Sequence, residues 1–577
     1  MCKTGVTTMA QVNRSARIHD VVVIGSGAGG GTVVQVLTKL GVNVTLLEAG
    51  PMLNPEKDFR EHQMPADFGH RGAGDGAPAY FGKQQRDFFE VKGSFWENET
   101  EPYTVAPGSQ FKWFRSRILG GRTNHYGRVS LRFAEYDFNP YSRDGLGVDW
   151  PIQYSDVAPY YDKAEAFIGV HGSKEGIPSA PDGIFQPPPA LRVPEILIQK
   201  SCTKLKIPCI PARRAMITKA LNGRAACHYC GQCGRGCLTA SAYSSSQVQI
   251  FPAMKTGKLT IITDAMAREL IAGDDGKIRA VTYIDKNTRT EKQIRCRTVV
   301  LAAGACETSR LLLNSKSARF PNGLANFSGQ VGRNLTDSVG FGVSGHVPAL
   351  EGLPRNNADG VRGSHVYVPW WLYDRKNDFP RGYHIELGGN FRFPSVGAFH
   401  GACSKYEGYG KTLKQNIWRE YGAGVGITGR GEMIPNEKSF CEIDKTVVDR
   451  WGIPVLRFHF AWGESERQMA KHMEQTFRSI IETMGGKVTS VGRNMTTPDG
   501  LSIGGSIIHE LGTARMGADR STSVTDGFSR THDHKNLFLA DAAPFASNPD
   551  KNPTLTIIAL AWRMSEYLAE EMRKGNV

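Results

Sequence analysis

The segment from Asp20 to Glu48 constrains the fold more than any other part of the chain. Residues 20–24 (DVVVI) form a run of β-branched side chains without alternation, which is typical of a strand buried on both faces. A glycine-rich turn follows, and residues 31–40 and 43–47 then have the patterns of a helix and of a second strand. A strand, a turn, a helix and a strand within about thirty residues predict a βαβ unit of a parallel α/β sheet.

The glycines of this turn match a dinucleotide-binding motif. Gly25, Gly27 and Gly30 have the spacing G-x-G-x-x-G, and Glu48 ends the second strand. The first glycine permits a tight turn, the second lets the backbone approach a pyrophosphate, and the third lets the helix pack on the strand. The positive end of the helix would face the phosphates, and Glu48 would accept hydrogen bonds from a ribose diol. Because NAD and FAD use the same motif, the motif leaves the choice between them open.

Four cysteines lie within eleven residues, in the run CHYCGQCGRGC. The spacing C-x2-C-x2-C-x3-C matches a ligand pattern of iron–sulfur clusters. Zinc and disulfides are the alternatives, but structural zinc sites usually separate two C-x2-C pairs, and disulfides would strain across such short loops. Ferredoxins with two clusters have a proline after the fourth cysteine, whereas Leu238 stands here, so the number of irons stays open. The predicted metal ligands are Cys227, Cys230, Cys233 and Cys237.

The composition is that of an ordinary soluble protein, long enough at 577 residues for two or more cores. No apolar run reaches the roughly 18–20 residues that span a bilayer, so we expect no membrane span. The formal net charge is +14, but Lys and Arg form no dense block, and we expect no nucleic-acid partner. The first twenty residues have neither an apolar core nor a twin arginine, so we expect no signal peptide there. The cysteines outside the run are scattered, which favours folding in the cytoplasm.

The remaining patterns divide the chain into an α/β part and a β-rich part. Helices are expected at 155–168, 465–484 and 554–573, a meander of strands at 259–285, and a buried strand at 298–302. Elements of this type and order predict a nucleotide-binding α/β domain with a second domain inserted in it. The expected divisions are 15–150, 246–340 and 501–577 for the nucleotide-binding domain, 341–500 for the substrate domain, and 151–245 for a connector that carries the cysteine loop.

Four distant segments together resemble the glucose–methanol–choline oxidoreductase family, whose members use FAD. They are the glycine motif with Glu48, residues 120–126, residues 301–312, and the block from His509 to Thr556, and they follow the family's order over nearly the whole chain. The resemblance implies an α/β fold in which a Rossmann-like FAD-binding domain contains an inserted β-rich α+β substrate domain. Besides the glycines and Glu48, it implies FAD contacts at Ala28, Gly120, Gly121, Thr123, Asn124, His125, Ala267, Ala303, Gly304, Asp541, Ala542, Pro553 and Thr554.

The C-terminal block carries the catalytic pair that the resemblance implies. His509 stands in the family's catalytic histidine motif, and Asn552 stands in the segment of its partner. Oxidation of an alcohol needs a base for the hydroxyl proton while hydride passes to flavin N5, and a neutral imidazole suits this task. An amide can hold the same hydroxyl without competing for the proton. Pro553 stands where a helix is expected to begin, so the positive end of that helix would face a reduced flavin.

The stretch 123–126 departs from the commoner family pattern. It is similar to a stretch of pyranose oxidases in which the histidine is bonded to the flavin 8α-methyl group. By that resemblance His125 is either attached covalently to FAD or packed against the dimethylbenzene ring. Covalent attachment would raise the flavin potential.

The flavin motifs and the cysteine run together resemble the iron–sulfur branch of the family, which includes large subunits of bacterial sugar dehydrogenases and glucoside 3-dehydrogenases. The resemblance implies that a sugar or glycoside hydroxyl is oxidised to a ketone or lactone. Electrons would leave through a cluster, with 3Fe-4S favoured over 4Fe-4S, to a small subunit and a cytochrome c-type acceptor. Export to the periplasm with a signal-bearing small subunit is compatible with this.

Two other functions stay open at this point. One is an oxygen-dependent pyranose or glycoside oxidase, for which a cluster would be superfluous. The other is a non-catalytic binding subunit that keeps the fold. Residues 370–373 (WWLY) offer aromatic rings either for stacking on a sugar or for a core.

Overall fold

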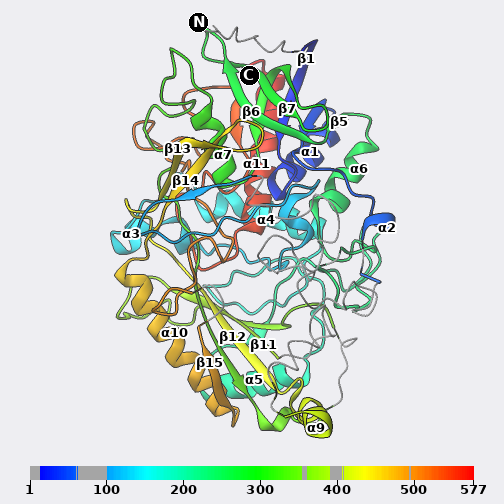
Figure 1. Ribbon diagram of the computed structural model, residues 1–577, viewed down its shortest axis with the longest axis vertical. Helices are drawn as coiled ribbons and strands as arrows, with labels where there is room; N and C mark the ends of the chain where they lie inside the picture. The colour runs from blue at the N-terminus through cyan, green and yellow to red at the C-terminus, as the bar shows by residue number, and fades with distance from the viewer. Residues whose placement is uncertain are drawn as a thin grey trace, which may run out of the picture.

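The structure is a computed structural model that describes residues 13–59, 61–62, 101–234, 236–353, 360–389, 406, 408–492 and 496–577. Part of the N-terminal stretch considered for a signal peptide, residues 1–12, lies outside the described residues. A seven-stranded sheet lies toward one end of the long axis and a six-stranded sheet toward the other (Figure 1). In the part of the chain that is described, no helix is both long enough and apolar enough to cross a bilayer.

The βαβ unit predicted from the glycine motif is confirmed. It consists of β1 (Asn13–Ile24), α1 (Ala28–Lys39) and β2 (Val44–Leu47), and β1 pairs with β2 in parallel. The apolar run of β1 is fully buried, as a strand at the centre of a parallel sheet requires. The helix begins before residue 31, because it accommodates three glycines in its first turn, where helix propensity is low.

The seven-stranded sheet has the order β5-β2-β1-β8-β7-β6, and β16 also pairs with β8. The expected meander at 259–285 is wrong in its first strand, because β5 extends the parallel layer beside β2 and only β6, β7 and β8 pair antiparallel in sequence. A short apolar run has the same sequence pattern whether its strand pairs in parallel with β2 or begins an antiparallel meander. The bounds are β5 (Leu259–Ile262), β6 (Ala265–Ala272), β7 (Ile278–Asp285), β8 (Thr290–Leu301) and β16 (Leu537–Leu539).

The six-stranded sheet is antiparallel, in the order β15-β9-β12-β11-β10-β4. Apolar side chains of α10 (Glu464–Thr483) are buried in the core of this sheet. A third, three-stranded sheet has the order β13-β14-β3. Trp370 is buried in the same core, beside Tyr383 and Phe379. The bounds are β4 (Ile210–Pro211), β9 (Val339–His346), β10 (Val366–Val368), β11 (Tyr383–Gly389), β12 (Gly424–Gly431), β15 (Lys487–Val491), β3 (Thr104–Val105), β13 (Phe440–Val448) and β14 (Pro454–His459).

The segment 151–245 contributes to both large cores. α4 (Tyr154–Ile168) packs against α11 (Thr554–Arg573) in the first core, whereas α5 (Val193–Lys204) packs against α10 in the second. The remaining described helical elements are α2 (Pro55–Asp58), η3 (Gly121–Asn124), η4 (Glu135–Phe138), α3 (Pro140–Asp144), η5 (Ser246–Ile250), α6 (Phe251–Met254), α7 (Ala305–Asn314), η6 (Pro348–Leu350) and α9 (Gly410–Glu420).

Candidate active site

A cavity of about 940 Å³ joins the glycine motif to the C-terminal block. This volume is at the upper end of the range of ligand cavities. His509 and Asn552 both line it. The residues expected to contact FAD that also line it are Gly25, Gly27, Ala28, Glu48, Gly121, Thr123, His125, Ala267, Ala303, Gly304, Asp541, Ala542, Pro553 and Thr554.

The glycines of the first turn serve two different purposes. A Cβ atom at Gly25 would lie 2.4 Å from the carbonyl oxygen of Ala302, and one at Gly30 would lie 1.9 Å from that of Gly25, so both positions allow close backbone packing. At Gly27, by contrast, no atom lies within 4 Å of the Cβ position. The N-terminal end of α1 therefore faces an open cradle, which fits a pyrophosphate.

Glu48 is a buried carboxylate at the wall of this cradle, only 5% exposed. Its Oε1 accepts a hydrogen bond of 2.8 Å from the Gly50 amide, and its Oε2 accepts one from the Ser26 hydroxyl. Burial raises the pKa of Glu48 above its ordinary value. Each carboxylate oxygen can accept a further bond, so the group fits the hydroxyls of a ribose.

Three of the expected FAD contacts do not line the cavity: Gly30, Gly120 and Asn124. Asn124 holds the loop instead, because its Nδ2 donates to the carbonyl oxygens of Leu119 at 3.0 Å and of Gly121 at 2.9 Å. Gly120 has a φ of 92°, which favours glycine. Both residues shape the turn that brings Thr123 and His125 to the cavity.

His509 and Asn552 meet side by side. The Nε2 atom of His509 lies 3.3 Å from Asn552 Nδ2, and its Nδ1 atom lies 2.9 Å from the Ser338 hydroxyl. When the amide donates to Nε2, the ring proton is on Nδ1 and is donated to Ser338. The unprotonated ring nitrogen that a general base needs is then Nε2, beside Asn552.

The surroundings keep this imidazole neutral. Burial and the nearby Arg430 guanidinium lower the pKa of His509 to about 3. The His509 amide donates to Asp337 Oδ1 at 2.9 Å, and the Ile507 amide donates to Asp337 Oδ2 at 3.2 Å. Between them Ile508 has a φ of 70°, an uncommon conformation for a β-branched residue, so Asp337 fixes a strained turn that aims His509 into the cavity.

An ion pair that the motifs do not reveal joins the two ends of the site. Arg122 Nη1 lies 2.8 Å from Glu510 Oε2, and both side chains line the cavity. Arg122 belongs to the loop with His125, and Glu510 follows His509. Their only sequence signal is that each is adjacent to a predicted site residue.

The six-stranded sheet adds a second pair that sequence reasoning missed. Glu386 on β11 and Arg430 on β12 line the cavity, with 3.1 Å between Oε2 and Nη2. Although burial alone would raise it, the Arg430 guanidinium holds the pKa of Glu386 well below its usual range. The pair faces the neighbourhood of His509, since both charges act on the His509 imidazole.

The cysteine loop reaches the same cavity. Cys227, Cys233 and Cys237 share one apolar group with Met216, Ala242 and Val361, and Gly234 lines the cavity. Backbone amides lie near the sulfurs, with the Tyr229 amide 3.4 Å from Cys227 Sγ, and the Gln232 and Ala242 amides 3.5 Å from Cys230 Sγ and Cys237 Sγ. Such bonds orient and tune thiolate ligands.

The sulfurs are not gathered around a single ion. Among the described residues, the one tight group of possible metal ligands, with atoms within 4.8 Å of one another, contains three carboxylates and no cysteine. Tetrahedral zinc, with Zn–S bonds of about 2.3 Å, would hold its thiolates roughly 4 Å apart. A cluster binds each thiolate to a different iron and takes wider spacing. The described cysteines therefore show neither a zinc site nor a cluster.

Comparison with known proteins matches most of the chain to one family. Residues 9–339 and 435–561 match two sequence models of GMC oxidoreductases. The fructose dehydrogenase large subunit of Gluconobacter japonicus is 29% identical over 96% of this chain and 98% of that protein. The 2-methyl-1,2-propanediol dehydrogenase of Mycolicibacterium austroafricanum is 30% identical over 96% of each, and the paromamine 6'-oxidase of Streptomyces fradiae is 27% identical over 96% and 92%.

Solved structures show the same fold. The crystal structure of pyridoxine 4-oxidase from Mesorbium loti superposes with a TM-score of 0.60 at 15% identity, covering 96% of this chain and 99% of that one. A formate oxidase structure from Aspergillus oryzae gives a TM-score of 0.62 at 16% identity, covering 98% and 100%.

Proposed function

Because this chain belongs to the GMC oxidoreductase family, we propose that it is an FAD-dependent dehydrogenase that oxidises a hydroxyl of a sugar or glycoside to a ketone or lactone. The observation that carries the proposal is the meeting of His509 and Asn552 in a cavity that also reaches the glycine cradle and Glu48. When bound, FAD supplies the acceptor for the hydride that leaves the substrate carbon. All other parts of the reaction are tasks of the chain's own side chains.

Each side chain has a defined task in this proposal. The cradle at Gly27 would hold the pyrophosphate, Glu48 would hold a ribose, and Pro553 and Thr554 at the N-terminal end of α11 would contact the flavin. His509 Nε2 takes the hydroxyl proton of the substrate, while Asn552 Nδ2 donates to the substrate oxygen. Asn552 Oδ1 is buried and has no hydrogen-bond partner among the described residues, so it is available to accept from a second hydroxyl.

The charged pair Glu386–Arg430 supports a polyhydroxylated substrate. A carboxylate accepts hydrogen bonds from hydroxyls and a guanidinium donates to them. An apolar alcohol would instead displace water from both charged groups without forming hydrogen bonds to them. Leaving a buried polar group unsatisfied costs at least about 1–3 kcal/mol of binding free energy. Fructose dehydrogenase, a relative over nearly the whole chain, is named for such a substrate.

We further propose that electrons leave singly through an iron–sulfur cluster at Cys227, Cys230, Cys233 and Cys237, with three irons favoured. The amides near the sulfurs and the contact of Gly234 with the cavity support this exit. A small subunit and a cytochrome c-type protein would receive the electrons, and export with the small subunit belongs to the same proposal. The name of the relative "fructose dehydrogenase large subunit" supports a subunit partner.

His125 is proposed to contact the flavin, either through a covalent bond or by packing. Burial and the Arg128 guanidinium lower the pKa of His125 to about 3, so the imidazole is neutral at ordinary pH, which suits both forms. Acid precipitation separates them, because a covalently bound flavin stays with the protein pellet and is released only by proteolysis as a flavin peptide. In the variant His125→Ala, all flavin would then be released by acid.

The proposal is tested by reducing the purified protein under argon with a panel of sugars and glycosides. We expect substrate to bleach the flavin absorbance, and His509→Ala to slow bleaching by about 10²- to 10⁴-fold. His459→Ala is the matched control, because His459 on β14 pairs with Glu442 on β13 and does not line the cavity. Normal bleaching in His509→Ala would contradict the role of this base.

The same preparation tests the electron exit. We expect iron and labile sulfide in the protein and a cluster signal in electron paramagnetic resonance, in the oxidised protein for three irons and in the reduced protein for four. Absence of both elements would contradict the exit. Stoichiometric hydrogen peroxide at full turnover in air would instead support an oxidase, the activity for which paromamine 6'-oxidase is named.

A further inference from the structure

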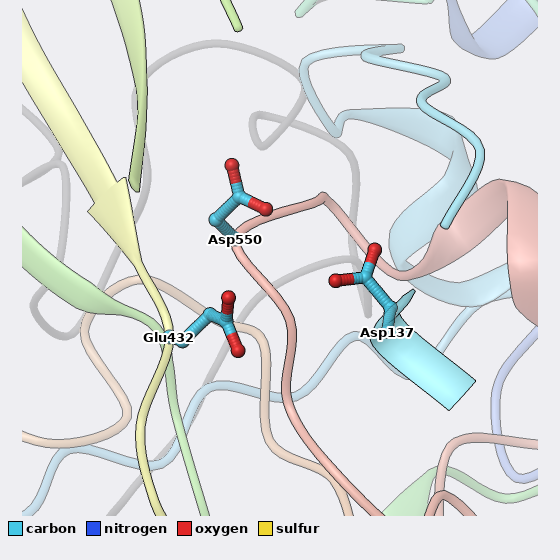
Figure 2. Close-up of side chains that lie close together, drawn as sticks. All are labelled: Asp137, Glu432 and Asp550. Atoms are coloured by element: carbon cyan, nitrogen blue, oxygen red, sulfur yellow. The ribbon is translucent and has the colours of Figure 1, made fainter. Parts of the chain in front are cut away.

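Three buried carboxylates lie close together beside the loop before α11, which carries Asn552. Asp137, Glu432 and Asp550 come from three distant segments, and one oxygen of each lies within 4.8 Å of the others (Figure 2). Their residues are 1–3% exposed. Asp137 belongs to η4, Glu432 directly follows β12, and Asp550 lies in the loop before α11. Such a group often holds a divalent cation.

Here a side chain of the protein supplies the cation. Lys551 Nζ lies 2.9 Å from Asp137 Oδ2 and 2.5 Å from Asp550 Oδ1, and it donates to the Tyr136 hydroxyl at 3.3 Å. The ammonium is therefore ion-paired with two carboxylates and hydrogen-bonded to one hydroxyl. Arg143 and Arg381 lie 3.5 Å and 3.7 Å from Glu432 Oε2. Both arginines also pair with Asp144, so three cations lie among four carboxylates, and the ammonium is the cation beside Asp137 and Asp550.

The position of this network in the chain gives it a consequence for catalysis. Lys551 directly precedes Asn552, whose amide lies 3.3 Å from His509 Nε2. The carbonyl oxygen of Asp550 is in turn hydrogen-bonded to His384 Nδ1. The loop is therefore held from one side by the Lys551 ammonium and from the other by the ring of His384, immediately before the residue that must meet the substrate.

From this we propose that Lys551, held by Asp137 and Asp550, is a positioning residue that sets the Asn552 amide against His509. A charge pair is strong in the low-dielectric interior, so the Lys551 ammonium ties the loop before α11 to Asp137 of η4. The proposal rests on the proposed function, because it needs Asn552 to act on the substrate. Without the ammonium, the amide would shift, and a shift of about 1 Å costs up to about 10²-fold in rate.

The test is a double-mutant cycle on flavin reduction under argon, with the substrate that reduces the native protein. We expect Lys551→Met to lower the limiting reduction rate by about 10- to 100-fold with little change in the substrate concentration for half-saturation. In an Asn552→Ala background, the same substitution should change the rate by less than about threefold, because residues that act through one another are not additive. The matched control is Lys163→Met, which breaks the exposed pair of Lys163 with Glu566.

A purely structural role would give a different pattern. Lys551→Met leaves a buried excess of negative charge, so Lys551→Met/Asp137→Asn restores the charge balance and is expected to recover melting temperature and FAD content while the reduction rate stays low. Recovery of the native rate in this double variant would overturn the proposal, as would an equal loss in both Asn552 backgrounds. If Asn552→Ala alone reduced flavin at the native rate, the failure would lie in the proposed function instead.

Discussion

The imidazole of His509 is half-buried in the cavity wall, where desolvation and the charge of Arg430 lower its pKa to about 3 from an ordinary value of 6.5. A lowered pKa means that the free base persists at every pH above it. The rate of flavin reduction by substrate should therefore stay nearly constant from about pH 8 to about pH 5 and fall only in more acidic solution. Stopped-flow absorbance under argon measures this, and a half-maximal rate near the ordinary imidazole pKa would contradict it.

Glu386 is the residue on which selectivity for sugars over simple alcohols should depend. Replacing its carboxylate by an amide in Glu386→Gln weakens bonds to hydroxyls and leaves Arg430 without its partner. We expect kcat/KM for a hexose or glycoside to fall by roughly 10- to 100-fold, since hydrogen bonds to charged groups contribute about 1.5–3 kcal/mol. The value for a small monohydric alcohol should change by less than about threefold.

The ratio of the two kcat/KM values is the measurement that decides this point. Glu442→Gln is the control, because Glu442 pairs with His459 on a partly exposed strand and does not line the cavity. If Glu386→Gln lowered both values equally, Glu386 would act on the base or on the fold rather than on substrate choice.

At the scale of elements, two glycines of the first βαβ unit are expected to affect different properties, Gly27 the affinity for FAD and Gly29 the stability of the fold. A Cβ atom at Gly29 would lie 1.4 Å from the carbonyl oxygen of Ala540, whereas one at Gly27 meets open space in the cavity. Gly29→Ala should therefore lower the free energy of unfolding by at least about 2 kcal/mol, as overpacking does. Gly27→Ala should keep the melting temperature of the apoprotein and lose affinity for FAD.

Thermal unfolding of FAD-free protein and titration with FAD measure the two effects separately. A destabilised Gly27→Ala apoprotein would show that this glycine is needed for backbone packing. Full FAD affinity in Gly27→Ala would show that the cradle does not hold the cofactor.

Sequence patterns predicted correctly those helices and strands whose pattern lies within their own residues. The G-x-G-x-x-G turn and the amphipathic residues of α11 marked one βαβ unit and one helix, and both are present. The start of α1 was missed because glycines inside a helix have the composition of a turn. The place of β5 was missed because strand pairing depends on distant partners, and its short apolar run fits either edge of the sheet.

At the scale of the whole molecule, the site is assembled from contacts that no local pattern encodes. Glu386 and Arg430 reach the cavity because β11 and β12 pair in a sheet built around a separate core. Asp137 meets Lys551 across 414 positions of sequence, the difference between the two residue numbers. Family motifs therefore marked residues that line the cavity, whereas the charged residues around them came only from the tertiary structure.

The proposed cluster gives a prediction that spans the molecule, because it would separate flavin reduction at His509 from electron exit at the cysteine loop. Cys227, Cys233 and Cys237 share one apolar group, and Cys230 is not part of it. We therefore expect serine at any of those three positions to abolish bound iron, cluster signal and reduction of cytochrome c. Cys230→Ser should retain a three-iron cluster, and all four variants should still be bleached by substrate under argon.

Iron and sulfide analysis, electron paramagnetic resonance and cytochrome c reduction are compared with the rate of anaerobic bleaching in each variant. Cys209→Ser serves as the control, since Cys209 lies outside the run and does not line the cavity. Equal loss of iron in Cys230→Ser would assign all four thiolates as ligands, which favours four irons. Loss of bleaching together with loss of iron would mean that the loop supports the flavin site itself, and the separation of reduction from exit would then be wrong.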